Sequence, residues 1–490
     1  MKLIATGTVA VMLALLPAPS LPPYRAFAQG SKDPLERVPK LLQVLDRDGF
    51  QVEPGSFIVL DPIANACAPK PLIPSAWYNN VQPYLAALLP RDWETQPSER
   101  VLPPAYFLRQ DEAILVVGAT PPPMAYFSFQ TFLLARYNPK TVNYASPGNF
   151  FAPYEALFSY LGDTVNSLTI RTTGPSAFNR PMALISTGSR TTREGLRAAL
   201  LAAGYEASII NTETLPSSLI RFGYGSADQF LFLMRTALAV GGNAVIDKYK
   251  NDVLTGKVMQ VFRVRPKVQS APHPLPAPVL RTRGTGHTEM DLFPVMEKLR
   301  QAILSRFSSY AAEELDTSLP VPEGYPAIQR DVPWLGPDKE GSAGYGRDAN
   351  YLASSWFDLG DNDFAIVYGV DHATTGKATY SSASVYLDKT LAAGVQTVDS
   401  STFEEFPGSA DSYLAGDPAA GKFYVWKVAR SCGGDPYCME AKSPDLCASR
   451  IGPQPPVRIG FRAYAEPATR TGPSDVELIY DRVIVFRPKQ

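Results

Sequence analysis

The amino-acid sequence predicts a multi-domain α+β protein, with a ferredoxin-like α/β sandwich in the middle and a mostly antiparallel β-sandwich or barrel at the C-terminus. The chain has 490 residues, of which 45% are hydrophobic and 19% are charged, as is typical of packed domains. Helix-like and strand-like segments alternate within residues 163–266, whereas residues 345–490 are mostly strand-like. The 46 prolines and 35 glycines favour many turns and short strands.

Residues 1–28 have the pattern of a secretory signal peptide. Lys2 precedes an apolar stretch from Leu3 to Leu16, and Ala26-Phe27-Ala28 is a cleavage pattern. The apolar stretch is short for a bilayer span, and prolines interrupt the chain after it. We therefore expect a secreted protein, periplasmic or extracellular, with no membrane insertion after the signal is removed. The net charge of −1 gives no general attraction to nucleic acid, so no nucleic-acid partner is expected.

The first mature region, residues 31–160, combines one helix with several strands. Apolar residues recur at helical spacing from Pro34 to Asp46, which predicts the helix. Ala113 to Val117 is a buried-strand run, and the segment from Ala125 to Tyr137 begins with strand-like alternation. The three prolines between these segments predict that the two strands pair with each other.

The second region, residues 163–266, gives the clearest pattern. Met182 to Ser186 reads as a strand, and a helix follows from Thr191 or Thr192 to Ala203, with Gly204 able to end it. A second helix is expected from Ser226 or Asp228 to Leu238, and a strand from Val258 to Val264. This order suggests the ferredoxin-like sandwich.

Residues 267–340 are expected to be proline-rich connectors around one long helix at 288–307. That helix places Leu292, Met296, Leu299 and Ile303 on one face. The β domain at 345–490 follows, and turn residues separate its strand-like segments. These segments are Phe364–Val370, Ala378–Tyr386, Phe423–Val428, Val457–Ala463 and Val476–Phe486.

Four cysteines favour disulfide bonds in an oxidising compartment: Cys67, Cys432, Cys438 and Cys447. Three pairings are open. We favour Cys432–Cys438, because the turn residues between them can bring the two sulfurs together, and this leaves Cys67–Cys447. A zinc site is the alternative, but the cysteine spacing is not a usual ligand pattern and no histidine lies nearby.

A candidate catalytic group lies in the segment from Gly369 to Tyr380. If this segment is a hairpin, Asp371, His372, Lys377 and Tyr380 cluster at one end of the sheet. An imidazole beside a carboxylate, an ammonium group and a phenol could transfer protons. The alternative is a polar loop whose histidine packs on the sheet edge.

A candidate anion site lies between a predicted strand and a predicted helix, at Ser189, Arg190, Thr191 and Thr192. Free backbone N–H groups at the helix start, three hydroxyls and a guanidinium would suit a carboxylate, sulfate or phosphate. Ordinary helix capping with a solvated arginine explains the same residues.

No organic cofactor is predicted, and a metal site is considered only at one cluster of carboxylates. Asp361 and Asp363 lie near other aspartates and asparagines, a density of oxygen ligands that could hold Ca²⁺. A polar turn between strands is the alternative. The chain has only three histidines and no H-E-x-x-H motif, which disfavours a histidine-rich metal site.

The sequence leaves two classes of function open. The favoured hypothesis is an extracytoplasmic binding or structural protein, with a groove between domains for a small-molecule or saccharide ligand. The alternative is a cofactor-independent secreted hydrolase or lyase that uses His372 as acid/base on an anionic or carbohydrate-like substrate. The scarcity of histidine and the lack of a complete catalytic motif favour binding, whereas polar loops at domain junctions keep the enzyme hypothesis open.

Overall fold

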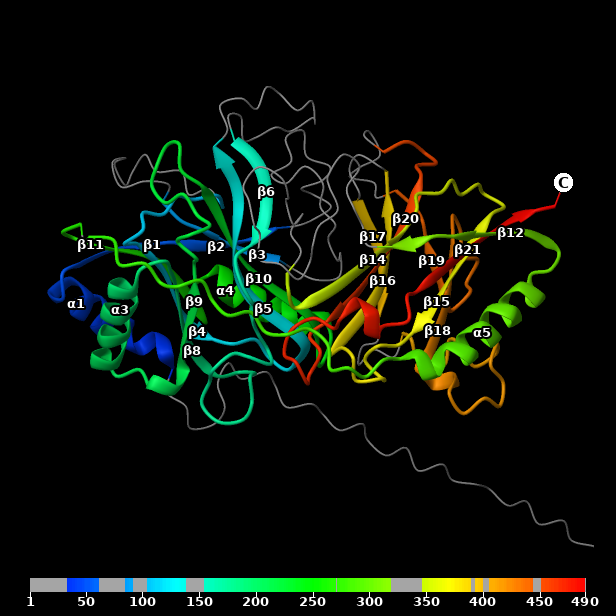
Figure 1. Ribbon diagram of the computed structural model, residues 1–490, viewed down its shortest axis with the longest axis horizontal. Coiled ribbons are helices and arrows are strands. Elements are labelled where there is room, and N and C mark those ends of the chain that lie inside the picture. Colours follow the sequence, from blue (N-terminus) through cyan, green and yellow to red (C-terminus); the bar gives the residue numbers. More distant parts are fainter. Residues whose placement is uncertain are drawn as a thin grey trace, which may run out of the picture.

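The computed structural model describes residues 33–60, 84–90, 104–137, 154–269, 271–318, 346–388, 393–399, 405–443 and 451–489. These residues form a mixed α+β structure of mostly antiparallel sheets with four α-helices, as the sequence predicts at this level. Figure 1 shows two β-rich halves side by side. We refer to residues 33–266 as the N-terminal half and to residues 293–489 as the C-terminal half.

The N-terminal half contains two sheets. Sheet I has the strand order β1-β11-β4-β8-β9, and sheet II has the order β2-β3-β10-β5-β6, with β7 also paired to β5. The strands of sheet I are β1 (Phe50–Pro54), β4 (Ala113–Ala119), β8 (Pro181–Thr187), β9 (Ile210–Thr214) and β11 (Met259–Pro266). The strands of sheet II are β2 (Ser56–Leu60), β3 (Tyr84–Leu88), β5 (Met124–Tyr137), β6 (Tyr154–Tyr160), β7 (Val165–Asn166) and β10 (Gln229–Ala239).

The main core of this half lies between sheets I and II. Val116 from β4 and Phe232 from β10 belong to one buried cluster, and Tyr249 of helix α4 (Asn243–Leu254) completes it. The other face of sheet I is covered by η1 (Pro34–Arg37), α1 (Val38–Arg47) and α3 (Arg190–Ala203). Strands β8 and β9 are parallel because α3 connects them, followed by the short η3 (Ala207–Ile209).

Strand pairing crosses the boundary that the sequence analysis placed between residues 31–160 and 163–266. Strand β1 pairs with β11, β4 with β8, and β5 with β10. The strands of 163–266 therefore complete sheets begun by the first region, and they do not form a separate ferredoxin-like sandwich. The prolines between β4 and β5 carry the chain from sheet I to sheet II. These two strands therefore do not pair with each other, and the prediction that they would was wrong.

The second helix predicted in this region is a strand in the structure. Residues 229–239 form β10, which pairs with β5 along almost its whole length. Phe232 packs into the core between the sheets, while Leu231 and Leu233 are buried on the opposite face. The sequence of a strand that is covered on both faces is a continuous apolar run. The spacing of its apolar residues does not distinguish such a strand from a buried helix.

A proline-rich segment, residues 271–281, leaves the N-terminal half along the start of α3. We call it the strap. Arg190 N donates to His273 O, Leu275 N donates to Gly188 O, both at 2.8 Å, and the Leu275 side chain is buried. After η4 (Met290–Leu292), the long helix α5 spans Phe293–Arg306 and begins later than the predicted residue 288. Pro294 lies in its first turn, where proline is tolerated.

The C-terminal half also contains two sheets, and in both of them most neighbouring strands are antiparallel. Sheet III runs β12-β21-β15-β18-β19, and sheet IV runs β13-β14-β20-β16-β17. The strands of sheet III are β12 (Tyr310–Leu315), β15 (Phe364–Val370), β18 (Phe423–Ala429), β19 (Cys438–Glu440) and β21 (Arg482–Pro488). The strands of sheet IV are β13 (Thr317–Ser318), β14 (Ala349–Ser354), β16 (Tyr380–Leu387), β17 (Ala393–Asp399) and β20 (Val457–Tyr464). Two short 3₁₀ turns, η5 (Ala420–Lys422) and η7 (Asp475–Glu477), precede β18 and β21.

Sheets III and IV face each other across a second core. Val367 and Trp426 from sheet III share one buried cluster with Val385 and Ile459 from sheet IV. Helix α5 packs on the other face of sheet III, where Met296 belongs to a cluster with strands β15 and β21. Both faces of sheet III are therefore covered, which accounts for the fully buried pattern of β15.

A buried polar joint connects the two halves. Arg235 of β10 donates to Asp348, which lies just before β14, with 2.9 Å between Nη2 and Oδ1. Both side chains are at most 4% exposed. The Tyr126 hydroxyl also donates to Asp348, and the Tyr126 ring packs against Tyr464 with ring centres 4.7 Å apart. This joint fixes how the halves meet.

Candidate functional site

A hollow lies beside the edge of sheet I, where the strap leaves it. Its volume is about 430 Å³. The walls come from the turn between β6 and β7, from β9, from α3 and from the end of the strap. We call it the arginine pocket; the lining residues used below are Asp163, Arg171, Arg197, Asn211, Glu213 and Arg281.

A break in strand pairing creates the floor of the arginine pocket. Strand β6 ends at Tyr160 and β7 begins at Val165, and both pair with β5. Thr131 of β5 lies opposite this break, so no strand carbonyl faces its N–H on that side. The N–H donates instead to Glu213 Oε1 of β9, at 2.6 Å. The Thr131 hydroxyl donates to Glu213 Oε2 at 2.5 Å. Glu213 thus reaches from sheet I to sheet II and is held in one orientation.

Glu213 is a buried carboxyl group with an altered acidity. Burial raises its pKa above the ordinary value, and the hydrogen bonds from Thr131 and Ser186 only partly oppose this effect. A carboxyl group with a raised pKa in a pocket can carry a proton under conditions where exposed glutamates are ionised. In that form it adds no negative charge to the pocket.

The substitution Glu213→Gln tests this assignment. A folded-state pKa above the ordinary 4.5 means that the group stabilises the fold below that pH, and that this contribution is lost as pH rises through the folded pKa. We expect the wild-type free energy of unfolding to fall over this interval relative to Glu213→Gln, because glutamine does not titrate. Urea unfolding of both proteins from pH 4.5 upward measures the difference. Parallel curves would show that Glu213 titrates normally.

Three guanidinium groups surround the arginine pocket. Those of Arg171 and Arg197 have no hydrogen-bond or ion-pair partner among the described residues. Arg281 Nη1 lies 3.6 Å from Asp163 Oδ2, and Asp163 also accepts from the Arg281 N–H at 2.7 Å. Arg347 of the C-terminal half holds the other oxygen of Asp163 at 2.9 Å. Asp163 is therefore occupied by structural contacts, and the remaining guanidiniums give the pocket a positive character.

Among the described residues that line the pocket, none is aromatic. Threonine hydroxyls and Asn211 supply the other polar groups, and the Asn211 side chain is fixed by backbone contacts with Arg171, Ala183 and Ile209. The arrangement suits a small polar molecule that carries negative charge and hydroxyl groups. It offers no flat apolar surface for stacking.

The predicted catalytic residue His372 is buried in an ion-pair cluster. Its Nδ1 lies 2.9 Å from Glu289 Oε1, and its Nε2 lies 3.7 Å from Asp481 Oδ2. We call these three residues the histidine cluster; all are at most 5% exposed. Burial alone would lower the pKa of His372, but the facing carboxylates raise it well above the ordinary value. The geometry favours a structural role, and the predicted proton transfer to a substrate finds no support in it.

The other three residues of the predicted catalytic group do not gather with His372 at an open surface. Lys377 Nζ pairs with Glu466 at 3.0 Å and Glu477 at 2.6 Å. Asp371 Oδ1 accepts from Ser381, and burial raises the Asp371 pKa. Tyr380 is fully buried, with its ring centre 5.5 Å from that of Tyr464.

The predicted anion site at the start of α3 is used for capping. Ser189 Oγ accepts from Thr192 N at 3.2 Å, and the Thr192 hydroxyl donates to Asp111 O at 2.8 Å. The Arg190 N–H is taken by the strap, and the Thr191 hydroxyl lies 3.1 Å from His273 Nδ1. The structure gives the capping alternative direct support, and anion binding at this place stays a prediction.

The predicted calcium ligands lie in the turn before β15. Asp363 Oδ2 accepts from Gly360 N at 2.9 Å, and Asp361 Oδ1 accepts from Gln454 at 3.0 Å. Within the described ranges, no group of three or more His, Cys, Asp or Glu residues is placed to hold a metal ion. The calcium site stays a prediction.

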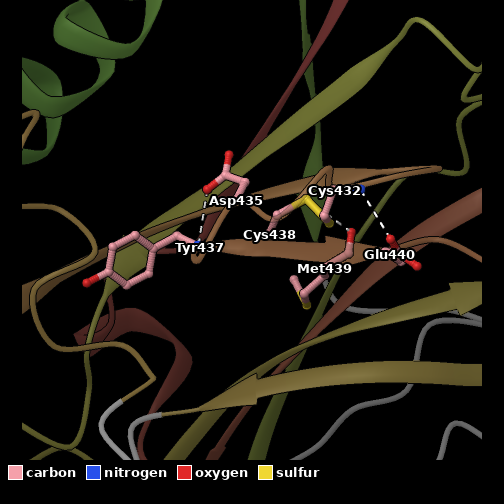
Figure 2. The surroundings of a disulfide bond; sticks show 6 residues. All are labelled: Cys432, Asp435, Tyr437, Cys438, Met439 and Glu440. Atoms are coloured by element: carbon pink, nitrogen blue, oxygen red, sulfur yellow. Dashed lines mark hydrogen bonds between the residues drawn. A yellow bond between two sulfur atoms is a disulfide. The ribbon is translucent and has the colours of Figure 1, made fainter.

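The disulfide bond Cys432–Cys438 is confirmed, with an S–S distance of 2.06 Å (Figure 2). The turn between the two cysteines is closed by Tyr437 N, which donates to Asp435 Oδ1, and Cys432 N donates to Glu440 Oε1. Cys67 and Cys447 lie outside the described residues, so their pairing stays a prediction. No helix in the described segments is long and apolar enough to cross a membrane.

Sequence reasoning missed the arginine pocket. Arg171 follows a turn, Arg197 lies on α3 and Arg281 ends the strap, so no local motif connects them. The one available signal was Glu213, a charged residue inside a short strand-like segment of β9.

Comparisons with known proteins place the chain near two solved structures at low similarity. No protein-family profile and no curated protein matches the chain. An uncharacterized protein from Burkholderia cenocepacia is 11% identical with a TM-score of 0.41, and the alignment covers 93% of this chain and 87% of that chain. The VPA0106 protein from Vibrio parahaemolyticus is 11% identical with a TM-score of 0.36, over 83% of this chain and 89% of that chain. The chain is similar to these proteins at a level that carries no argument about function.

Proposed function

We propose that the protein is an extracytoplasmic binding protein that takes a small anionic ligand in the arginine pocket. One observation carries this proposal. Two guanidiniums without partners among the described residues, Arg171 and Arg197, line the same hollow as the buried carboxyl group of Glu213. Guanidinium groups bind carboxylate, sulfate and phosphate oxygens with paired hydrogen bonds, so two of them at one hollow favour a ligand with an acidic group.

The remaining lining narrows the ligand class. The threonine hydroxyls of the lining can bond to ligand hydroxyl groups, because hydroxyls both donate and accept. The lack of aromatic lining residues argues against a ligand held by ring stacking. We therefore propose a hydroxylated acid, such as a uronic acid or a sulfated or phosphorylated sugar.

The proposed location rests on the sequence and on one covalent bond. The signal-peptide pattern of residues 1–28 supports export, and the Cys432–Cys438 bond is the kind of cross-link that persists in oxidising compartments. Binding is favoured over the hydrolase or lyase alternative, because His372 is buried with both ring nitrogens facing carboxylates.

Isothermal titration with glucuronate, sulfate and citrate tests the proposal. We expect at least one of these anions to bind the wild-type protein and glucose to compete with none of them. Arg171→Gln and Arg197→Gln should each weaken binding about ten- to a hundredfold, because a hydrogen bond to a charged group contributes about 1.5–3 kcal/mol. The single variants should be compared at the same pH and ionic strength.

Arg193→Gln is the matched control. Arg193 lies on α3 like Arg197, but it pairs with exposed Glu194 and does not line the pocket. Its substitution should leave anion affinity unchanged. Loss of binding in Arg190→Gln, with normal binding in Arg171→Gln and Arg197→Gln, would instead assign the anion to the start of α3 and refute the arginine pocket.

A further inference from the structure

A second hollow is lined by Ser189 at the start of α3 and by the beginning of the strap. Its volume is about 270 Å³. We call it the tyrosine hollow; the lining residues used below are Arg109, Gln110, Asp111, Phe222, Tyr224 and Gln269. None of these residues lines the arginine pocket. Its walls combine two aromatic rings with a pair of opposite charges.

Hydrogen bonds to buried residues fix Tyr224, one of the two aromatic residues that line the tyrosine hollow. The Tyr224 hydroxyl donates to the fully buried carboxylate of Glu112, which also accepts from Arg263 at 2.6 Å. The Arg263 guanidinium lies over the Tyr224 ring, 5.5 Å from its centre. Because the hydroxyl is engaged inside the protein, the Tyr224 ring is held in one orientation beside the hollow.

Phe222 is fixed in a similar way. Its ring stacks on the buried ring of Phe230 with centres 6.0 Å apart. A side-chain carbon added at Gly188 would lie only 2.5 Å from the Phe222 ring, so the glycine is what lets the ring approach. The hollow therefore has two aromatic rings whose orientations are set by packing that lies outside it.

The polar side of the tyrosine hollow is electrically balanced. Arg109 forms two hydrogen bonds with Asp111, from Nε and from Nη2, both at 2.9 Å. This pairing cancels the two charges and leaves N–H donors on the Arg109 guanidinium. The side-chain amides of Gln110 and Gln269 add further donors and acceptors.

We propose that the tyrosine hollow binds a neutral pyranose unit. A pyranose has an apolar C–H face that packs on aromatic rings, and its neighbouring hydroxyls pair with planar groups such as guanidinium, carboxylate and amide. The fixed rings of Phe222 and Tyr224 match the first requirement, and the Arg109–Asp111 pair with the two glutamine amides matches the second. The arginine pocket differs in each respect, since it is positive and has no aromatic lining. The two hollows are thus suited to neutral and acidic sugars respectively.

Saturation-transfer-difference NMR of the full-length protein with glucose, galactose, mannose and N-acetylglucosamine tests the proposal. We expect transfer to the ring protons of at least one sugar. Tyr224→Ala should abolish it, provided that circular dichroism shows the variant to be folded. Gln269→Ala is the second variant, because Gln269 is exposed and its loss should not affect folding. It should weaken binding about two- to tenfold, as expected for one hydrogen bond.

Val268→Ala is the matched control, because Val268 is adjacent in sequence, 82% exposed and outside the hollow. Its sugar affinity should equal that of the wild-type protein. Transfer retained in Arg171→Gln would show that the sugar site is independent of the arginine pocket. No transfer to any of the four sugars, or equal transfer in wild type, Tyr224→Ala and Gln269→Ala, would overturn the proposal.

Discussion

Replacing Asp348 with asparagine is expected to lower the free energy of unfolding by about 3–5 kcal/mol, the usual cost of breaking a buried ion pair from one side. Asp348 accepts hydrogen bonds from Arg235 and Tyr126, and both Asp348 and Arg235 are at most 4% exposed. Burial alone would lower the pKa of Arg235, but Asp348 and nearby tyrosines raise it well above the ordinary value. Because arginine is protonated at neutral pH in any case, the guanidinium would stay charged and buried without its carboxylate.

Urea unfolding of Asp348→Asn at neutral pH measures this loss. Asp252→Asn is the matched control, because Asp252 pairs with Lys248 on the exposed side of α4, at 2.6 Å. An exposed helix pair of this spacing contributes about 0.3–0.5 kcal/mol, so the control should be nearly neutral. Equal effects of the two substitutions would contradict the buried joint between the halves.

The substitution Glu289→Gln is expected to cost about 3–5 kcal/mol near pH 6, because it removes the main ionic partner of the buried His372. Glu289 also accepts from the Thr375 hydroxyl at 2.6 Å and from Ile479 N at 3.0 Å. Burial would raise the pKa of Glu289, but the imidazolium of His372 and these hydrogen bonds lower it below the ordinary value. Glu289 thereby ties the segment before η4 and α5 to the loops that follow β15 and precede β21 in sheet III.

The pH dependence of this loss follows from the two shifted pKa values. The raised pKa of His372 means that its contribution is complete below the ordinary 6.5 and is lost as pH rises through the folded value. The lowered pKa of Glu289 means that its contribution is complete above the ordinary 4.5 and is lost as pH falls through the folded value. The gap between wild type and Glu289→Gln should therefore be widest between pH 4.5 and 6.5.

Glu297→Gln is the control for the histidine cluster. Glu297 lies on α5 and pairs with Arg482 at 2.5 Å, but both side chains are partly exposed. Its loss should cost less than about 1 kcal/mol. A Glu289→Gln loss that does not vary with pH would contradict a charged His372–Glu289 pair.

The difference between β15 and β10 shows what the sequence could reveal about the fold. Both strands are buried on both faces, so neither shows alternation. β15 is rich in valine, isoleucine and tyrosine, which favour strands, and its predicted bounds, Phe364–Val370, match the structure. β10 contains leucine, methionine and alanine, which favour helices, and it was predicted as one. Its pairing with β5, about 100 residues earlier in the chain, overrides that local preference.

The candidate sites also depend on contacts between residues that are distant in the sequence, and local patterns predict them even less well. A short turn between cysteines was enough to predict Cys432–Cys438, because the chemistry is local. The residues grouped around His372 were also neighbours in sequence, but their real partners, Glu289 and Asp481, come from distant segments. The arginine pocket depends on the path of the strap beside β9, which no pattern in the sequence encodes.

The most direct test of the proposed function is a crystal structure of the protein soaked with selenate, a sulfate-like dianion whose selenium scatters anomalously. We predict an anomalous peak within hydrogen-bond reach of Arg171 and Arg197, and its disappearance in the Arg171→Gln, Arg197→Gln double variant. An empty arginine pocket at a selenate concentration that saturates the protein in titration would contradict anion binding there. A selenate bound only at the start of α3 would contradict it equally.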